Sequence, residues 1–164
     1  MDENTLIGKI KENLKKKGYG IQENIEYGDY KFLLVGHLSK FEVSKFGTND
    51  YFFTVGKVKE PILANIRDLS NQSFGYSGGH RSNPLPPGIF GGYWVFPIIM
   101  VESVSESVSN AIQNEVPPKH WSSAEFPIVV DLTSKKTYYF QGTPIWGAAY
   151  YAGFRQLINE IVAL

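Results

Sequence analysis

Two long stretches of this sequence carry almost no formal charge. Between Leu69 and Val101 the only charged side chain is Arg81, and between Thr137 and Phe154 there is none. Exposed protein surfaces rarely lack charged side chains over such lengths, so both stretches are expected to be covered. They form either the core of the domain or a surface that another molecule covers, and we favour the core.

The composition supports a single self-sufficient domain. The chain has 164 residues, of which 43% are hydrophobic, which is enough to build one core without a metal or a disulfide. It contains no cysteine, which excludes disulfides, thiolate chemistry and cysteine-based zinc sites. Sixteen Lys and Arg balance sixteen Asp and Glu, so no net charge attracts nucleic acid or an acidic membrane. We therefore expect one globular domain over residues 1–164.

Two features favour a cytoplasmic location without a membrane segment. The first residues, Met1 to Asn4, are followed by no apolar stretch of signal-peptide length. The longest apolar run, Ile89 to Val101, is shorter than the roughly 18 residues needed to cross a bilayer, and it contains glycine and proline. We interpret this run as a buried strand.

Apolar spacing and turn residues predict the elements of the first half of the chain. A helix is expected from Thr5 to Lys17, because Leu6, Ile10 and Leu14 lie on one face and lysines stand near its C-terminal end. Pro61 opens a second helix, which is expected to end between Ser70 and Ser73. Four strands are expected between these helices, at Ile21–Tyr27, Tyr30–Leu38, Phe41–Phe46 and Tyr51–Val58.

Residues 75–92 predict a long Gly/Pro-rich loop, since six glycines and three prolines among these eighteen residues break any regular element. After it we expect an apolar strand, a helix opened by the capping box Ser103–Glu106, two strands and a final helix that begins at Thr143 and Pro144. The expected ranges of these elements are Tyr93–Glu102, 103–115, Phe126–Leu132, Thr137–Gln141 and 144–164.

The segment from Tyr93 to Leu132 predicts a parallel strand pair. Its helix makes the connection long enough for a crossover, and both of its strands are apolar on both faces. The earlier strands are expected to form an antiparallel meander. The sequence therefore predicts an α+β fold with a mixed, mainly antiparallel sheet and about four helices, in the order α-β-β-β-β-α-β-α-β-β-α.

Two acidic residues are expected at neighbouring strand ends. If the pair is parallel, Glu102 and Asp131 lie at the carboxyl edge, where such sheets usually bind ligands. With Lys135 close by, they could hold Mg²⁺ or Mn²⁺ and activate a water at a phosphate. The simpler interpretation, which we favour, is that the two acids cap the following turn and helix.

This arrangement resembles that of restriction-endonuclease-like nucleases, which pair carboxylates and a lysine on adjacent strands. The lysine of those enzymes normally stands two residues after the second acid, whereas here Thr133 occupies that position and Lys135 follows two residues later. The resemblance is therefore one of topology, and an inactive relative fits it equally well.

The segment Gly75–Arg81 is a second candidate site, because glycines let backbone N–H groups turn toward an anion and Arg81 could clamp it. Its spacing matches neither a P-loop nor a dinucleotide-binding motif, and a linking loop is the simpler interpretation, which we favour. The predicted ligand-binding residues are Tyr76, Gly78, Gly79, His80, Arg81, Phe90 and Tyr93, with Gly88, Gly91 and Gly92 as hinges.

Other familiar constellations do not occur in the sequence. The histidines His37, His80 and His120 form no i, i+4 pair, so no metal site is expected, and His37 and His120 are interpreted as packed or hydrogen-bonded structural residues. No serine lies in a nucleophile elbow, and the aromatic clusters lack the basic groove of nucleic-acid binders. The final helix, residues 144–164, is apolar on more than one face, so it either packs inside the monomer or forms a homodimer.

These observations favour a non-enzymatic, intracellular binding or protein-interaction module without a cofactor. Its partner would be a protein or a small molecule that meets the Gly-rich loop and the aromatic surface near it. The alternative is a metal-dependent phosphodiesterase or nuclease-like enzyme that uses Glu102, Asp131 and Lys135.

Overall fold

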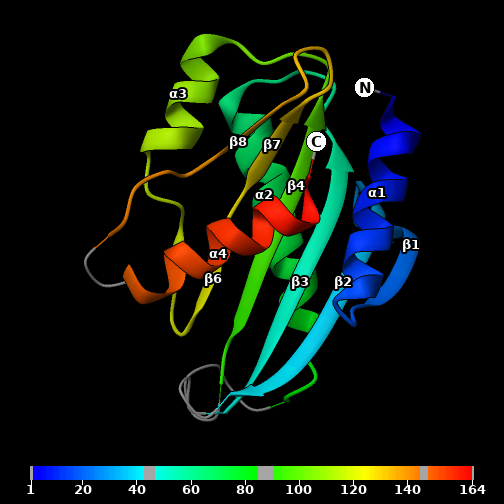
Figure 1. Ribbon diagram of the computed structural model, residues 1–164, viewed down its shortest axis with the longest axis vertical. Coiled ribbons are helices and arrows are strands. Elements are labelled where there is room, and N and C mark those ends of the chain that lie inside the picture. The colour runs from blue at the N-terminus through cyan, green and yellow to red at the C-terminus, as the bar shows by residue number, and fades with distance from the viewer. Residues whose placement is uncertain (1, 43–46, 85–90, 145–147, 164) are drawn as a thin grey trace.

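A mixed β-sheet runs through the middle of the molecule, and helices cover both of its faces (Figure 1). The structure, a computed structural model, describes residues 2–42, 47–84, 91–144 and 148–163. The helices in these ranges are α1 (Glu3–Lys16), α2 (Leu63–Gly79), α3 (Glu106–Asn114) and α4 (Ala148–Ile161). The strands in the same ranges are β1 (Gly20–Tyr27), β2 (Tyr30–Glu42), β3 (Gly47–Lys57), β4 (Tyr93–Val101), β5 (Lys119–His120), β6 (Ser123–Glu125), β7 (Ile128–Asp131) and β8 (Lys136–Tyr139).

The strand pairing confirms the predicted fold class, an α+β fold with a mixed, mostly antiparallel sheet. Strands β1, β2 and β3 form an antiparallel meander, and β4 lies parallel to β3 because α2 carries the chain back across the sheet. Strand β4 then pairs in parallel with β6 along its first half and with β7 along its second half. The predicted parallel pair is thus confirmed, and Val101 lies beside Asp131.

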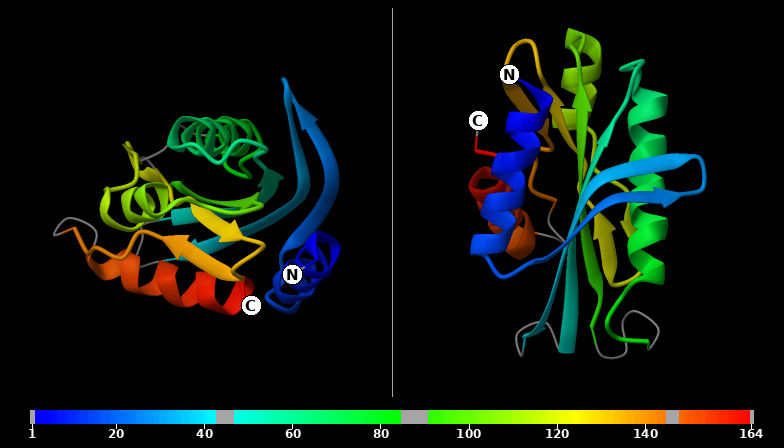
Figure 2. Two further views of the ribbon diagram at one scale, coloured as in Figure 1. Left: turned by 90° about the horizontal axis from the view of Figure 1, so that it is seen from above. Right: turned by 90° about the vertical axis from the view of Figure 1, so that its right-hand side faces the viewer.

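Two cores lie on the two faces of the sheet. Helices α1 and α4 cover one face, and α2 and α3 cover the other (Figure 2). Strand β3 contributes to both cores, because successive side chains of a strand point to opposite faces. Phe53 packs in the core under α1 and α4, and its neighbour Phe52 packs in the core under α2 and α3.

Core formation accounts for part of the scarcity of charge in the two neutral stretches. Every residue of β4 is buried except Trp94, which is partly buried. Helix α2 buries one face, which includes Leu69 and Tyr76. In the second stretch, Tyr151 and Phe154 of α4 are buried against the sheet.

The predicted loop at residues 75–92 was wrong at its start, because α2 continues to Gly79. A Cβ at Gly78 would lie 2.9 Å from the Tyr93 hydroxyl, and a Cβ at Gly75 would lie 3.2 Å from the Tyr27 hydroxyl. These glycines therefore allow aromatic side chains to pack closely against the helix and do not form a turn. Residues 85–90, with the predicted site residue Phe90 and the hinge Gly88, lie outside the described residues.

The predicted strands Tyr30–Leu38 and Phe41–Phe46 are one strand over their described part. Strand β2 continues to Glu42, because Ser39 and Lys40, where a break was expected, pair with β3 like the residues before them. Residues 43–46 lie outside the described residues. The short strands β5 and β6 form an antiparallel pair that sequence patterns did not predict.

The helices differ from the prediction mainly at their starts. Helix α3 is capped by Ser105 rather than Ser103, and the Ser105 hydroxyl accepts a hydrogen bond from the Val108 N–H. Residues 143–144 are not helical, residues 145–147 lie outside the described residues, and α4 is helical from Ala148. It packs on its own sheet through Phe154, and a homodimer through residues 144–164 stays a prediction. Among the described helices, none combines the length and the apolar character needed to cross a membrane.

Candidate functional site

A cleft of about 290 Å³ opens between α2 and α3 on one face of the sheet. Residues of β5 and β6 also line it. Concave and largely apolar sites with a few convergent polar groups are where proteins bind small molecules. The apolar lining includes Leu63, Ile66, Ala111, Ile112, Val116 and Pro127.

Two polar side chains converge on Glu125 in this cleft. Only 3% of Glu125 is exposed. The Ser70 hydroxyl donates a hydrogen bond to Glu125 Oε2, and His120 Nε2 lies 3.1 Å from Glu125 Oε1. The His120 ring also stacks on Phe74, with the ring centroids 3.7 Å apart. The carboxylate is therefore held from both of its oxygens.

The local structure explains why these side chains meet. Glu125 is the last residue of β6, and the parallel pairing with β4 sets it beside Val95, in the sheet region covered by α2. Ser70 lies one helical turn after Ile66 on the buried face of α2. His120 pairs with Ser123 across the β5–β6 hairpin. Helix α2 and the β5–β6 hairpin, which are distant in sequence, thus meet at one carboxylate.

An ion pair and exposed apolar side chains border the cleft. Arg67 of α2 pairs with Glu115, the residue that follows α3. Val116, which lines the cleft, is 55% exposed, and Ile62, the neighbour of the lining residue Leu63, is 52% exposed. The apolar part of a ligand can therefore continue from the cleft onto an apolar rim.

The arrangement around Glu125 suits the recognition of a positive charge. A carboxylate offers about four lone-pair sites, so two contacts leave room for a further donor. In the described contacts Ser70 and His120 each bond to Glu125 and not to each other. This differs from the serine-to-base hydrogen bond that activates a nucleophile.

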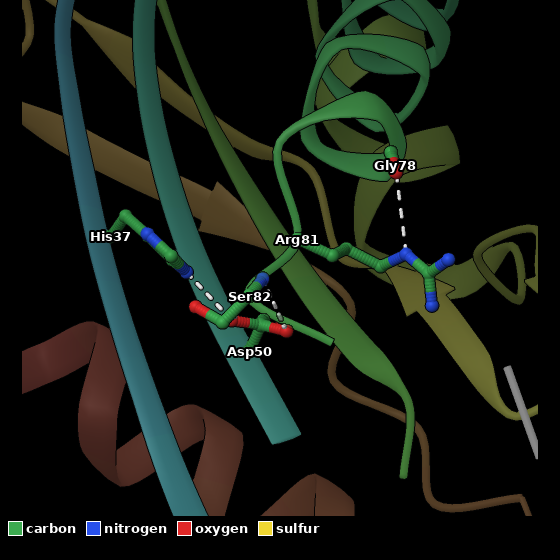
Figure 3. Close-up of polar contacts among 5 residues, drawn as sticks. All are labelled: His37, Asp50, Gly78, Arg81 and Ser82. Atoms are coloured by element: carbon green, nitrogen blue, oxygen red, sulfur yellow. Dashed lines mark hydrogen bonds and ion pairs between the residues drawn. The ribbon is translucent and has the colours of Figure 1, made fainter. Parts of the chain in front are cut away.

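A second buried carboxylate, Asp50, lies at the start of β3 (Figure 3). Its Oδ1 lies 2.7 Å from His37 Nε2, and the Ser82 N–H donates to Oδ1 and Oδ2 at 3.2 and 3.3 Å. Burial by itself raises the pKa of Asp50, but the hydrogen bonds from His37 and Ser82 outweigh burial and lower it. The interpretation of His37 as a structural residue is confirmed, since its ring also stacks on Phe52 at 4.2 Å.

The side chain of Asn49, the neighbour of Asp50, binds the backbone just before β4. The Gly92 N–H donates to Asn49 Oδ1 at 2.9 Å, and the Asp50 N–H donates to the Gly92 carbonyl at 3.1 Å. Asn49 and Asp50 therefore tie the described residues Ser82 and Gly92, which lie between α2 and β4, to β3.

The anion cradle, which was the alternative to a linking loop, does not form over residues 75–79. These residues are the last turn of α2, and the C-terminus of a helix presents carbonyl oxygens where a cradle needs N–H groups. Arg81 donates from Nε to the Gly78 carbonyl at 3.2 Å (Figure 3). Its guanidinium lies 5.4 Å from the Tyr93 ring centroid. Arg81 thus stabilises this helix end.

The remaining predicted residues around this turn are not grouped in one open site. Tyr76 is buried, and its hydroxyl donates to Gln22 Oε1 at 3.0 Å. His80 stacks on Tyr76 with the ring centroids 4.0 Å apart, and Tyr93 is buried in the core under α2. Ligand binding by Tyr76, Gly78, Gly79, His80, Arg81 and Tyr93 stays a prediction.

The strand-end candidate is only partly assembled. Asp131 is buried at the end of β7, where its Oδ1 accepts the Ser134 N–H at 2.7 Å and its Oδ2 accepts the Val104 N–H at 3.1 Å. Burial raises the pKa of Asp131, but these backbone hydrogen bonds lower it overall. Asp131 thus caps the turn, as the simpler interpretation expected.

The other two members of this candidate point to the same conclusion. The Glu102 side chain is exposed, and its carbonyl accepts the Thr133 N–H at 3.1 Å. Lys135 is exposed in the turn with a φ of 56°. Within the described ranges no three His, Cys, Asp or Glu side chains lie together as a possible metal site. A catalytic role for Glu102, Asp131 and Lys135 stays a prediction.

Sequence reasoning missed Glu125 and Ser70 as site residues. His120 was interpreted as a packed or hydrogen-bonded residue, and its contacts with Phe74 and Glu125 confirm this. One signal was available for Glu125, because it directly precedes the apolar run that starts at Phe126. An acid next to a strand that is apolar on both faces lies close to the core.

No protein family, curated protein or solved structure matches the chain.

Proposed function

We propose that this chain is a non-enzymatic binding module whose α2–α3 cleft holds a small organic cation with an apolar body. The observation that carries this proposal is the buried carboxylate of Glu125 in a mainly apolar cleft. A ligand of this kind matches the cleft in charge and in polarity.

Removing the Glu125 carboxylate from water costs free energy. An ionised group removed from water needs hydrogen bonds or an opposite charge to offset the lost hydration. Ser70 supplies a neutral hydroxyl to Glu125, and His120 supplies an imidazole nitrogen. A ligand ammonium group would add a charge-assisted hydrogen bond, which is stronger than one between neutral groups.

The size of the cleft sets the size of the ligand. At about 290 Å³ it lies near the lower end of the volumes of small-molecule sites. A single aromatic ring with a short aminoalkyl chain suits that space. The exposed side chains of Val116 and Ile62 would contact the part of a longer ligand that extends beyond the cleft.

A binding role fits the contacts of Ser70 better than a catalytic one. Its hydroxyl donates to Glu125, and His120 is bound to the other carboxylate oxygen. Both groups therefore orient Glu125, and a preorganised acceptor of this kind favours affinity because little ordering is needed on binding.

Calorimetric titration with benzylammonium tests this function. We expect the wild type to bind it, Glu125→Gln to lose about tenfold or more in affinity because the charge is removed, and benzyl alcohol to bind much more weakly than benzylammonium. Glu115→Gln is the matched control, since that carboxylate is on the exposed rim, and it should change affinity by less than about threefold.

Two results would overturn the proposal. One is equal binding of benzylammonium by the wild type and by a Glu125→Gln variant whose thermal unfolding shows that it is folded. The other is a rise in melting temperature with Mg²⁺ or Mn²⁺ in the wild type but not in Asp131→Asn, which would favour the metal-dependent alternative.

A further inference from the structure

We infer that a second site lies on the opposite face of the sheet, in the groove between the end of α1 and α4, and that it takes a small aromatic anion. The groove has a volume of about 340 Å³. This groove is separate from the site of the proposed function, because it shares no lining residue with the α2–α3 cleft. The residues that line the groove include Tyr19, Tyr51, Tyr150, Lys17, Lys40 and Gly153.

Aromatic side chains from three parts of the chain line this groove. Tyr19 follows α1, Tyr51 lies on β3 and Tyr150 lies on α4. Tyr19 packs edge-on against Phe53 with the ring centroids 5.6 Å apart, and Tyr150 stacks on Trp94 at 5.5 Å. These contacts fix two of the rings, so a planar ligand meets a preformed aromatic surface.

The Tyr19 and Tyr51 hydroxyls remain uncharged at physiological pH. Burial raises the pKa of Tyr19, and the nearby Glu42 raises it further. Burial also raises the pKa of Tyr51, whose hydroxyl donates a hydrogen bond to Glu42 at 2.7 Å. These rings therefore add no negative charge that would repel an anion.

The charged side chains that line the groove in the described ranges are both lysines. Lys17 pairs with Glu160 of α4, and its side chain remains 36% exposed. Lys40 lies on β2, opposite Asn49 in the register of the β2–β3 strand pair. Glu160 is paired with Lys17, and Glu42 accepts a hydrogen bond from the uncharged Tyr51 hydroxyl. The described contacts give Lys40 no carboxylate partner, so its ammonium group is the one that would pair with an aromatic anion.

Gly153 leaves open space in the wall formed by α4. A Cβ at this position would have no atom within 4 Å, and the residue is exposed. A larger side chain there extends into the groove without entering the core. Gly153→Leu is therefore a blocking variant that leaves the fold intact, and Gly153→Ala is its matched control, because alanine also favours the helix.

Titration with benzoate tests the site. We expect the wild type to bind benzoate, with about a tenfold loss of affinity in Gly153→Leu and about a threefold loss in Lys40→Gln. Gly153→Ala and Glu125→Gln should bind benzoate as the wild type does. Benzamide, which is the same size but neutral, should bind several-fold more weakly.

Three results would overturn the inference, namely no benzoate binding by the wild type, unchanged binding in folded Gly153→Leu, or equal binding of benzamide and benzoate. None of these affects the α2–α3 cleft, because its probe is benzylammonium and its diagnostic variant is Glu125→Gln. Failure of the groove and failure of the proposed function are therefore distinguishable.

Discussion

Asp50 and Glu125 are both almost fully buried, but the groups around the two carboxylates differ. Asp50 is bonded by His37 and by the backbone of Ser82, so its charge is used within the fold. Glu125 lines an open cleft and has two side-chain partners. The first carboxylate therefore stabilises the fold, and the second is the one that we propose binds a ligand.

The lowered pKa of Asp50 makes its contribution to stability dependent on pH. The ionised form is favoured in the folded state, so the stabilisation is present above the ordinary carboxyl pKa and is lost as the pH falls through the lowered folded-state pKa. We expect Asp50→Asn to reduce the free energy of unfolding by about 1–3 kcal/mol at neutral pH.

Urea unfolding of the wild type and Asp50→Asn, from neutral pH down to about pH 3, measures this effect. The difference between the two proteins should shrink as the pH falls. A difference that stays constant over that range would contradict the role given to the Asp50 carboxylate.

The end of α2 is the element whose structure differs most from its sequence signals. Its glycines resemble turn residues, but the helix continues because Tyr76 and Ser77 are buried against the sheet. Local propensity favours a break at such residues, and tertiary packing overrides it. The strands β4 and β7 were predictable, because a strand that is covered on both faces appears in the sequence as a continuous run of apolar residues.

Arg81 stabilises the same helix end. It bonds to the Gly78 carbonyl and lies over the Tyr93 ring, so Arg81→Ala should lower the free energy of unfolding by about 1 kcal/mol. Arg67→Ala is the control on the same helix, because Arg67 makes an exposed ion pair worth less than about 1 kcal/mol. Equal stability of Arg81→Ala and the wild type in urea would show that the helix end does not depend on Arg81.

Two glycines should respond oppositely to the same change. A Cβ at Gly92 would lie 1.8 Å from the Ser122 carbonyl oxygen, so Gly92→Ala should destabilise the fold by about 1–3 kcal/mol through overpacking. Gly8, in α1, has no atom within 4 Å of such a Cβ, and Gly8→Ala should stabilise by about 0.5–1 kcal/mol. Thermal unfolding of both variants checks the pair, and a stabilising Gly92→Ala would be inconsistent with the close approach of β4 and the β5–β6 hairpin.

At the scale of the whole molecule, the fold was more predictable than its sites. The neutral stretches, the meander and the crossover depend on patterns within one segment, such as the apolar run around Val129. The Glu125 site depends on Ser70 and His120, which come from separate elements, and no local pattern records that they meet. The two proposed sites lie on opposite faces of one sheet and share no lining residue.

An NMR titration of the ¹⁵N-labelled protein with benzylammonium locates the cation on the protein. We expect the largest shifts at Ser70, His120 and Glu125, with little change around Tyr19 and Tyr150 on the other face. Shifts centred on those tyrosines, or scattered shifts that persist unchanged in Glu125→Gln, would contradict the proposed binding of the cation at Glu125.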